Sequence, residues 1–251
     1  MSARSTGLLR AALLPARGLA RIAASRPLWP WVAAPAALFG ALAVAALALG
    51  WGWASDTTAA WLGPAGRGLH AALYAALWLL AHAVAAALGV IGAWYATAAL
   101  TGPFHDRLSQ LVEAEELGSS AAPDATGWWT DLVMGVTHTL AAAAVWAAAG
   151  CALLPLQIVP VAGEVAYVAL GALVSAASLA WQTLDYPLSR RRMTLREKGG
   201  VLRAHPGETL GLGLGTLALL LVPGVNLLAM PAAVVGATWL VCDLERAGRL
   251  R

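Results

Sequence analysis

The fold of this chain is decided by residues 208–242, which read ETLGLGLGTLALLLVPGVNLLAMPAAVVGATWLVC. Two apolar arms, Leu210–Val222 and Leu227–Cys242, flank the turn Pro223-Gly224-Val225-Asn226. As helices, arms of about 13–16 residues would be about 20–24 Å long, whereas the core of a bilayer is about 30 Å thick. Proline breaks a helix, and glycine and asparagine favour a tight turn. We therefore predict a helical hairpin that dips into a membrane and returns to the same side.

The tip of this predicted hairpin would lie at membrane depth. Irregular backbone is tolerated there only where protein buries it or where it lines a watery cavity. The hairpin therefore predicts either partner helices around it or a pathway for a polar solute.

The composition is that of an integral membrane protein. Of the 251 residues, 60% are hydrophobic and 12% are charged, whereas soluble domains carry about 25% charged residues. The net charge of +3 gives no reason to expect nucleic acid as a partner, and no signal-peptide cleavage pattern is evident. The two cysteines offer neither a metal spacing nor a disulfide framework. The motifs of metalloproteases, serine hydrolases and Walker proteins do not occur, so we expect neither an enzyme nor a bound metal or cofactor.

Residues 1–31 form a basic N-terminal segment. With 3.6 residues per turn, a helix over residues 5–24 places Arg10, Arg17 and Arg21 on one face. That arrangement is typical of a helix that lies in the membrane interface. A frayed tail is the alternative, because Pro15 interrupts the pattern, and the sequence leaves both open.

Two helices long enough to span a bilayer are predicted within residues 32–100. They are Val32–Trp53 and Leu69–Leu100, joined by a turn-rich loop at Asp56–Gly68. His82 lies inside the second span, where an ionisable side chain is a functional candidate. We favour a neutral imidazole that is hydrogen-bonded to the neighbouring helix, because no second histidine or carboxylate lies one turn away.

The remainder of the chain alternates polar and apolar segments. A cytoplasmic polar segment, residues 101–131, precedes a first hairpin over residues 132–184. A basic segment, residues 185–207, leads to the second hairpin over residues 208–245. The predicted fold class is an all-α integral membrane protein, with two transmembrane helices plus two helical hairpins that partly or fully penetrate the bilayer. We expect one membrane domain over residues 1–251.

The charge distribution predicts the orientation. With both termini in the cytoplasm, every lysine and arginine except Arg67 lies on the cytoplasmic side, in accord with the positive-inside rule. The run Arg190-Arg191-Arg192 could bind anionic lipid headgroups, but we favour a topology signal.

Polar residues at the predicted membrane depth are few. Gln157 and Glu164 flank the first tip, and Asn226 lies in the second. Helix N-termini and exposed amides near such tips can hold an anion, although we favour Asn226 as the cap of the following helix. The repeated glycines from Gly211 to Gly215 superficially suggest a phosphate loop; close packing between helices is the better interpretation.

Four short segments occur in a characteristic order between residues 102 and 238. Residues 102–108 read GPFHDRL, residues 184–187 read LDYP, Arg203 precedes LGLG, and residues 222–238 read VPGVNLLAMPAAVVGAT. Together they resemble the bacterial CysZ sulfate permeases and the broader etoposide-induced protein 2.4 family. The motif positions are Pro103, Phe104, Asp106, Asp185, Tyr186, Pro187, Pro223, Pro231, Gly236 and Thr238.

The resemblance implies a bacterial inner-membrane protein with two spanning helices and two partly penetrating hairpins. It implies a homo-oligomer that passes sulfate inward for cysteine synthesis. The candidate anion-binding residues are Arg26 at the entry to the first span, Arg107 and Glu113 in the polar segment, and Asn226 at the second tip. Membrane lipid is a further expected partner.

Two departures from the family pattern bear on sulfate. The family carries an arginine pair where this chain has Leu28-Trp29-Pro30-Trp31, and Glu115 stands where arginine is common. Fewer cationic donors weaken the binding of a dianion, because charge-assisted hydrogen bonds are the strong ones. The alternative function is therefore a non-transporting membrane scaffold or lipid-interacting protein.

Overall fold

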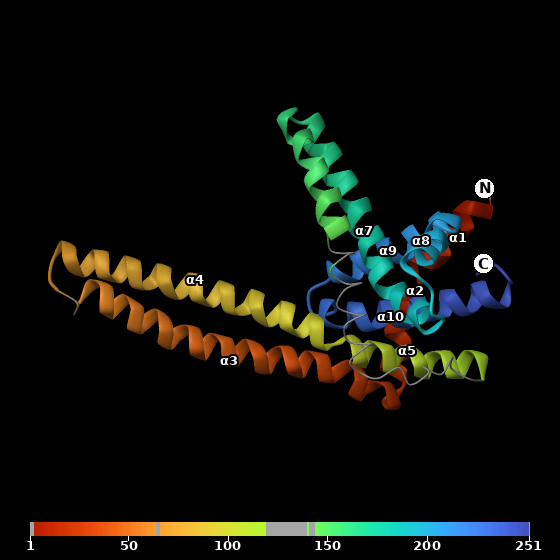
Figure 1. Ribbon diagram of the computed structural model, residues 1–251, viewed down its shortest axis with the longest axis horizontal. Helices are drawn as coiled ribbons and strands as arrows, with labels where there is room; N and C mark the ends of the chain where they lie inside the picture. The colour runs from red at the N-terminus through yellow and green to blue at the C-terminus, as the bar shows by residue number, and fades with distance from the viewer. Residues whose placement is uncertain (1–2, 64–65, 119–139, 141–143, 251) are drawn as a thin grey trace. The chain divides into compact units, whose positions relative to one another are not determined.

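The protein is built from helices (Figure 1). The computed structural model describes residues 3–63, 66–118, 140 and 144–250, and no strand occurs among them. In chain order the elements are α1 (Ala3–Ala12), α2 (Leu14–Ala24), η1 (Arg26–Leu28), α3 (Trp29–Leu62), α4 (Leu69–Leu100), α5 (Gly102–Leu117), η2 (Leu154–Ile158), α7 (Ala162–Arg190), α8 (Leu195–Ala204), α9 (Pro206–Leu220) and α10 (Asn226–Arg246).

Four helices in the described part of the chain are long and apolar enough to cross a membrane. These are α3 with its preceding turn, most of α4, α7 and α10. The prediction of an all-α membrane protein is therefore confirmed. Residues 119–139 and 141–143, which include part of the first arm of the first hairpin and the end of the polar segment, lie outside the described residues.

The helices group into two compact units. One unit is Ala33–Phe104, and the other combines Met1–Val32 with His105–Arg251. We call them the α3–α4 unit and the α10 unit.

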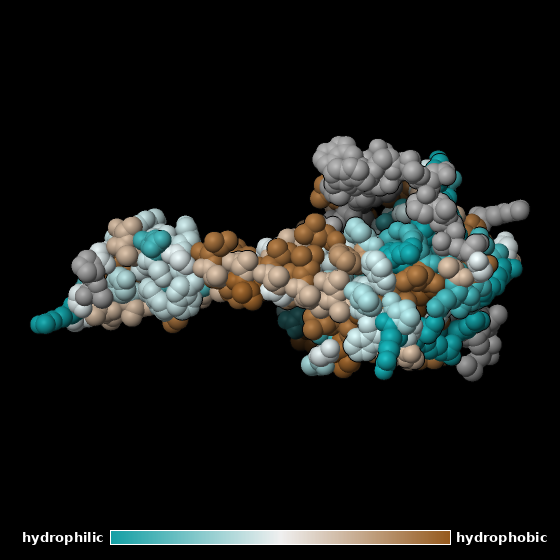
Figure 2. All heavy atoms as spheres, turned by 90° about the horizontal axis from the view of Figure 1, so that it is seen from below, coloured by the Kyte–Doolittle hydropathy of each residue, from teal (hydrophilic) through white to brown (hydrophobic). Residues whose placement is uncertain are grey.

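The α3–α4 unit is a hairpin of two long helices. α4 has the predicted bounds, but α3 has 34 residues and continues to Leu62. The prediction that a loop begins at Asp56 is therefore wrong. The helix continues to Leu62, and Gly63 then adopts a positive φ of 69°, a conformation that glycine tolerates. Figure 2 shows apolar side chains on the surface of this hairpin.

His82 joins the two helices of this unit. Its Nδ1 lies 2.7 Å from the carbonyl oxygen of Trp78, and its Nε2 lies 3.0 Å from Oγ of Ser55 on α3. A carbonyl can only accept, so Nδ1 donates to it. The ring also lies against Trp51 and Trp78. The predicted hydrogen bond to the neighbouring helix is confirmed.

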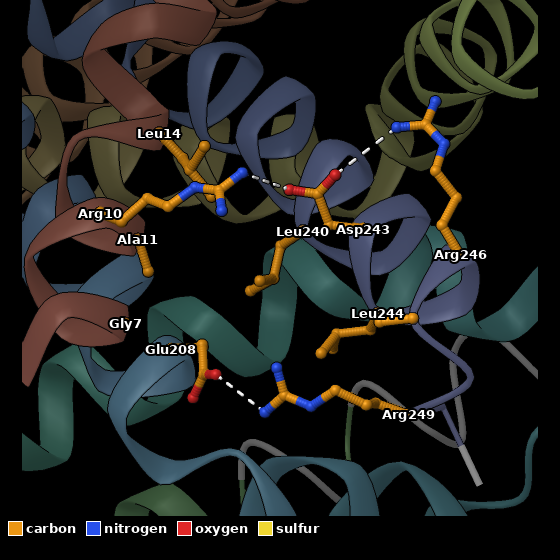
Figure 3. A pocket seen from close by; sticks show the side chains of 11 residues that line it. Gly7, Arg10, Ala11, Leu14, Glu208, Leu240, Asp243, Leu244, Arg246 and Arg249 are labelled. Carbon is orange, nitrogen blue, oxygen red and sulfur yellow. Dashed lines mark hydrogen bonds and ion pairs between the residues drawn. The ribbon is translucent and has the colours of Figure 1, made fainter. Parts of the chain in front are cut away.

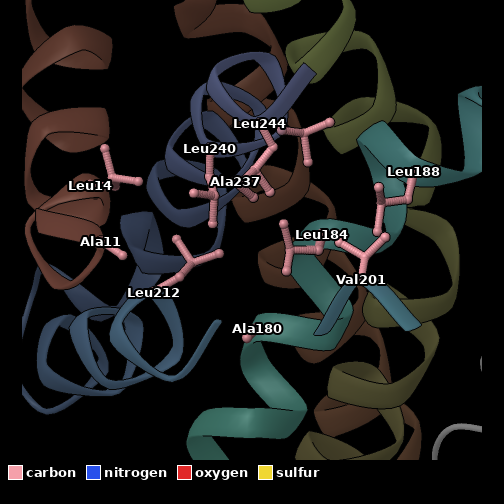
Figure 4. Packing of buried hydrophobic residues seen from close by; sticks show 11 residues of the cluster. Ala11, Leu14, Ala180, Leu184, Leu188, Val201, Leu212, Ala237, Leu240 and Leu244 are labelled. Atoms are coloured by element: carbon pink, nitrogen blue, oxygen red, sulfur yellow. The ribbon is translucent and has the colours of Figure 1, made fainter. Parts of the chain in front are cut away.

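The α10 unit packs its helices around α10. α2 and α7 contact α10, while α1 and α7 contact α9. One of the two apolar clusters of this unit (Figure 4) joins these helices, and its members include Ala11, Leu14, Ala180, Leu184, Leu212, Ala237 and Leu240. The N-terminal segment is therefore helical, and its apolar face, including Leu14, Gly18 and Ile22, is buried by protein. A frayed tail does not occur over α1 and α2, and the expectation that this segment lies in the membrane interface stays a prediction.

Small residues bring these helices together. A methyl group added at Gly211 would lie 2.2 Å from the carbonyl oxygen of Leu8, and one added at Gly213 would lie 1.9 Å from that of Ala176. A methyl group added at Gly18 would lie 2.2 Å from the carbonyl oxygen of Ala232. The predicted use of the glycines for helix packing is confirmed.

The second tip departs from the predicted capping. α10 begins at Asn226, Val225 occupies the N-cap position, and no side chain caps this end. The prediction that Asn226 is the cap is therefore wrong. α9 has 15 residues and α10 has 21, so α10 is longer than its apolar arm indicated and reaches the length of a full crossing.

Candidate functional site

A cluster of buried charges lies between α5, α7 and α10. The side chains of Arg190 and Glu113 are only 3% and 1% exposed. Arg190 donates to Oε2 of Glu113 from Nε at 3.0 Å and from Nη2 at 2.5 Å, and to Oδ1 of Asp106 from Nη1 at 2.7 Å. We call Asp106, Ser109, Glu113, Arg190 and Arg191 the Arg190 cluster.

The helix period explains how one guanidinium group reaches two carboxylates. Asp106, Ser109 and Glu113 follow each other at intervals of three and four residues, which places them on one face of α5. Arg190 is the last residue of α7, where the negative end of the helix dipole favours a cation. α5 and α7 therefore meet at their complementary polar faces.

Arg191 is the second cation of the cluster. It donates to Oε1 of Glu113 at 2.6 Å, to the carbonyl oxygen of Pro187 at 2.8 Å, and to Glu245 of α10. Burial alone would lower the pKa of Arg191, but the hydrogen bond that it donates to Glu245 and the charge of Glu113 raise the pKa above its ordinary value. Its Nε is buried and has no hydrogen-bond partner among the described residues, so the cluster holds one unused donor.

A relay of hydroxyl groups continues from the cluster into α10. Arg190 Nη2 donates to Oγ of Ser109 at 2.8 Å, and Ser109 lies 2.6 Å from Oγ1 of Thr238. Thr238 donates to the carbonyl oxygen of Val234 at 2.8 Å, so Ser109 must donate to Thr238. This relay fixes the orientation of Arg190 and gives the motif residue Thr238 a positioning role.

Of the four candidate anion-binding residues, Glu113 lies in the cluster and Arg107 lies at its edge. Arg107 is exposed and donates to Gln110 at 2.9 Å, and Gln110 donates to Oδ2 of Asp106 at 2.8 Å. Arg26 and Asn226 are exposed, and no described contact links either of them to the cluster.

Several motif residues form hydrogen bonds or are buried. Asp185 accepts from the buried Lys198 at 2.6 Å, and the hydroxyl of Tyr186 lies 3.2 Å from Nδ1 of His105. Burial lowers the pKa of His105 to about 4. The other motif positions comprise the buried Pro187, Pro231 and Gly236, the exposed Pro103 and Pro223, and Phe104, which is half-buried.

Further ion pairs attach α5 to its neighbours. Arg21 of α2 binds Glu115 at 2.8 Å, and Arg246 of α10 binds Glu116 at 2.7 Å. Glu115, which departs from the family pattern, thus has a partner on a neighbouring helix. The acidic face of α5 is neutralised by arginines of three other helices.

Sequence reasoning missed Arg190 and Arg191 as site residues. Their position in an arginine run beside a spanning helix is that of a topology signal. The spacing of Asp106, Ser109 and Glu113 could have indicated the site. It places two carboxylates on one face of a helix, and buried carboxylates need a cationic partner.

Comparison with known proteins is consistent with this architecture. Residues 14–231 match the family model described as sulfate transporter CysZ/etoposide-induced protein 2.4. Over 143 residues, the chain is 35% identical to a protein named sulfate transporter CysZ from Pseudomonas syringae pv. tomato, covering 55% of each chain. It is 32% identical over 143 residues to a protein of the same name from Pseudomonas fluorescens, covering 55% of this chain and 56% of the relative.

The chain thus matches about half the length of these curated relatives. The family match is broader, because it includes α2 to α9, all five residues of the Arg190 cluster and the start of α10. The chain therefore belongs to the sulfate transporter CysZ/etoposide-induced protein 2.4 family.

Proposed function

We propose that the protein is a membrane permease or channel for a small oxyanion, and that its substrate is sulfate. The observation that carries this proposal is the Arg190 cluster, in which two guanidinium groups are 3% and 11% exposed inside a helical membrane protein. Guanidinium groups are favoured for binding oxyanions at buried positions, because they present a rigid fork of N–H donors. Both named relatives are sulfate transporters, which agrees with an oxyanion as the ligand of these groups.

The chemistry of the cluster allows one anion to replace another. A guanidinium fork matches carboxylate and sulfate equally in geometry. Arg190 and Arg191 carry two positive charges, and their partners Asp106, Glu113 and Glu245 carry three negative ones. A dianion therefore binds only when at least one carboxylate moves away or takes up a proton, so the cluster in its described state is closed.

The remaining candidate residues have roles along the approach to this cluster. Arg26 attracts the anion at the cytoplasmic entry, and Arg107 organises the polar segment next to the path together with Glu113. The tip from Pro223 to Asn226 lines the path with backbone dipoles.

The wider setting follows from the family and the charge distribution. The chain lies in the bacterial inner membrane with both termini in the cytoplasm. α3 and α4 span the bilayer, both hairpins penetrate it partly or fully, and the two units act as one membrane domain over residues 1–251. The protein forms a homo-oligomer, and membrane lipid contacts its apolar helices.

Uptake of radiolabelled sulfate into proteoliposomes tests the proposal. Wild-type protein should take up label above empty liposomes, and unlabelled sulfate should compete. Arg190→Lys keeps the charge but loses the fork, so uptake should fall at least about tenfold, the equivalent of about 1.4 kcal/mol. Arg26→Ala should lower uptake, whereas Arg196→Ala, which changes an exposed arginine outside the site, should not.

The same experiment distinguishes the second candidate function, a non-transporting scaffold. The observation in its favour is that carboxylates balance both buried guanidinium groups of the cluster, as in an ion-pair network that only holds helices together. Folded wild-type protein that takes up no sulfate would reject transport and support the scaffold.

A further inference from the structure

A second charged site lies in the α10 unit, away from the Arg190 cluster. It is an open pocket of about 610 Å³ between α1, the start of α9 and the end of α10. Figure 3 shows Arg10, Glu208, Asp243, Arg246 and Arg249 around it. The volume is in the range of sites for small organic ligands, about 300–1,000 Å³, and is too large for a single tetrahedral oxyanion.

The rim of the pocket carries exposed arginines. The lining holds three arginines and two carboxylates, and Arg246 also pairs with Glu116, which lies outside the lining. Arg10 binds Asp243 at 2.9 Å, and Arg249 binds Glu208 at 3.1 Å. The side chain of Arg10 is 69% exposed and that of Arg249 is 52% exposed. A guanidinium group has five N–H donors, so the carboxylates orient these arginines while leaving donors that face solvent.

The wall of the pocket is apolar. Ala11, Leu14, Leu240 and Leu244 line it, and all four belong to the buried cluster of the α10 unit. A ligand that fits both surfaces is amphipathic, with an anionic group at the rim and hydrocarbon against the leucines. A free inorganic anion would leave the apolar wall in contact with water.

The position of the pocket on α10 indicates the source of such a ligand. Arg246 is the last residue of the apolar, span-length helix α10, and Arg249 follows it. The end of a membrane-spanning helix lies at the level of the lipid headgroups. Basic pockets at this level bind anionic headgroups.

We propose that this pocket binds the phosphodiester headgroup of an anionic membrane lipid. The phosphate accepts hydrogen bonds from Arg10 and Arg249, and the first methylenes of an acyl chain lie over Leu14 and Leu240. This site is independent of the proposed transport function, because none of its residues belongs to the Arg190 cluster.

Lipid-dependent thermal unfolding of the full-length protein in dodecyl maltoside micelles tests this proposal. Dioleoyl phosphatidylglycerol should raise the unfolding temperature in a saturable way. Dioleoyl phosphatidylcholine, whose headgroup has no net charge, and inorganic phosphate should not. Arg10→Gln should weaken the apparent lipid affinity about tenfold or more, and its exposure leaves the fold intact. Arg196→Gln, an exposed arginine outside the pocket, should bind like wild type.

Ala247→Phe provides an independent variant that changes no charge. Ala247 lines the pocket and is exposed, so a phenyl ring there should fill the opening and abolish the shift caused by phosphatidylglycerol. Equal stabilisation by phosphatidylcholine, or an undiminished shift in Ala247→Phe, would overturn the proposal. Equal stabilisation by inorganic phosphate would also overturn it and identify the pocket as a free-anion site.

Discussion

α3 and α10 are both apolar enough to cross a bilayer, but protein covers only α10. In the most apolar window of α3, 6% of the residues are buried, against 72% in α10. Val44 and Leu49 of α3 are 68% and 77% exposed, whereas Val234 and Val235 of α10 are fully buried. Hydropathy thus shows that a helix avoids water, but it does not show whether lipid or protein replaces the water.

The residues that make the difference are small ones and charged ones. In the α10 unit, the backbone of a neighbouring helix lies close to Gly18 and to Gly213. Small residues permit this close approach of two helices in lipid. The Arg190 cluster adds ion pairs, and the α3–α4 unit has only a hydrogen bond through His82 among its described interhelical polar contacts. Three predictions test this contrast.

The largest effect is expected at the buried ion pairs. Glu113→Ala leaves Arg190 and Arg191 buried without their shared carboxylate, which should lower the free energy of unfolding by about 3–5 kcal/mol. The matched control is Glu115→Ala on the same helix, where the exposed pair with Arg21 should contribute at most about 1 kcal/mol. Titration with SDS in dodecyl maltoside micelles measures both. Equal losses in the two variants would show that burial does not distinguish the pairs.

The second effect compares two helical glycines. Gly213→Ala places a methyl group 1.9 Å from the carbonyl oxygen of Ala176, so α7 and α9 must separate, at a cost of about 1–3 kcal/mol. Gly52→Ala on α3 meets no atom within 4 Å, so it should stabilise the helix by about 0.5–1 kcal/mol. The same SDS titration should give shifts of opposite sign. A loss at both positions would contradict the difference in packing.

The third effect is a dependence on pH in the α10 unit. The pKa of His105 falls from 6.5 to about 4 on folding because burial disfavours the charged ring. The unfolded chain therefore binds more protons between these values, and stability falls as the pH drops below 6.5. The loss should reach about 2 kcal/mol at pH 5. His105→Gln should lose this contribution when unfolding is compared at pH 7 and pH 5. An unchanged pH profile in this variant would assign the dependence to other groups.

Much of the fold could be predicted from local sequence. The bounds of α4 match because an apolar run ends at Thr101-Gly102, and the turn at Pro223-Gly224 follows from the backbone preferences of those residues. The end of α3 could not be predicted from Asp56, because residues of moderate helix propensity can continue a helix when nothing interrupts it. The partners of the N-terminal helices could not be predicted either, because an amphipathic face fits a membrane surface and a protein surface equally.

The sequence predicted the residues that α5 contributes to the candidate site, but not those at the end of α7. Asp106, Ser109 and Glu113 follow each other at helical intervals, so their common face could be read from the sequence. Arg190 lies 77 residues after Glu113, and no local pattern links the two. The pocket formed by Arg10, Glu208 and Arg249 joins the two ends of the chain for the same reason.

By itself, the sequence determined the membrane class, the helical segments, the tip turns and the family resemblance, because composition and backbone preference act locally. Tertiary structure alone decided which apolar helices are covered by protein and which arginines have carboxylate partners. Those properties depend on contacts between residues far apart in the chain. Lipid and protein are equally apolar environments, so hydropathy cannot distinguish α3 from α10. Only the close approach of small residues and the pairing of buried charges do so.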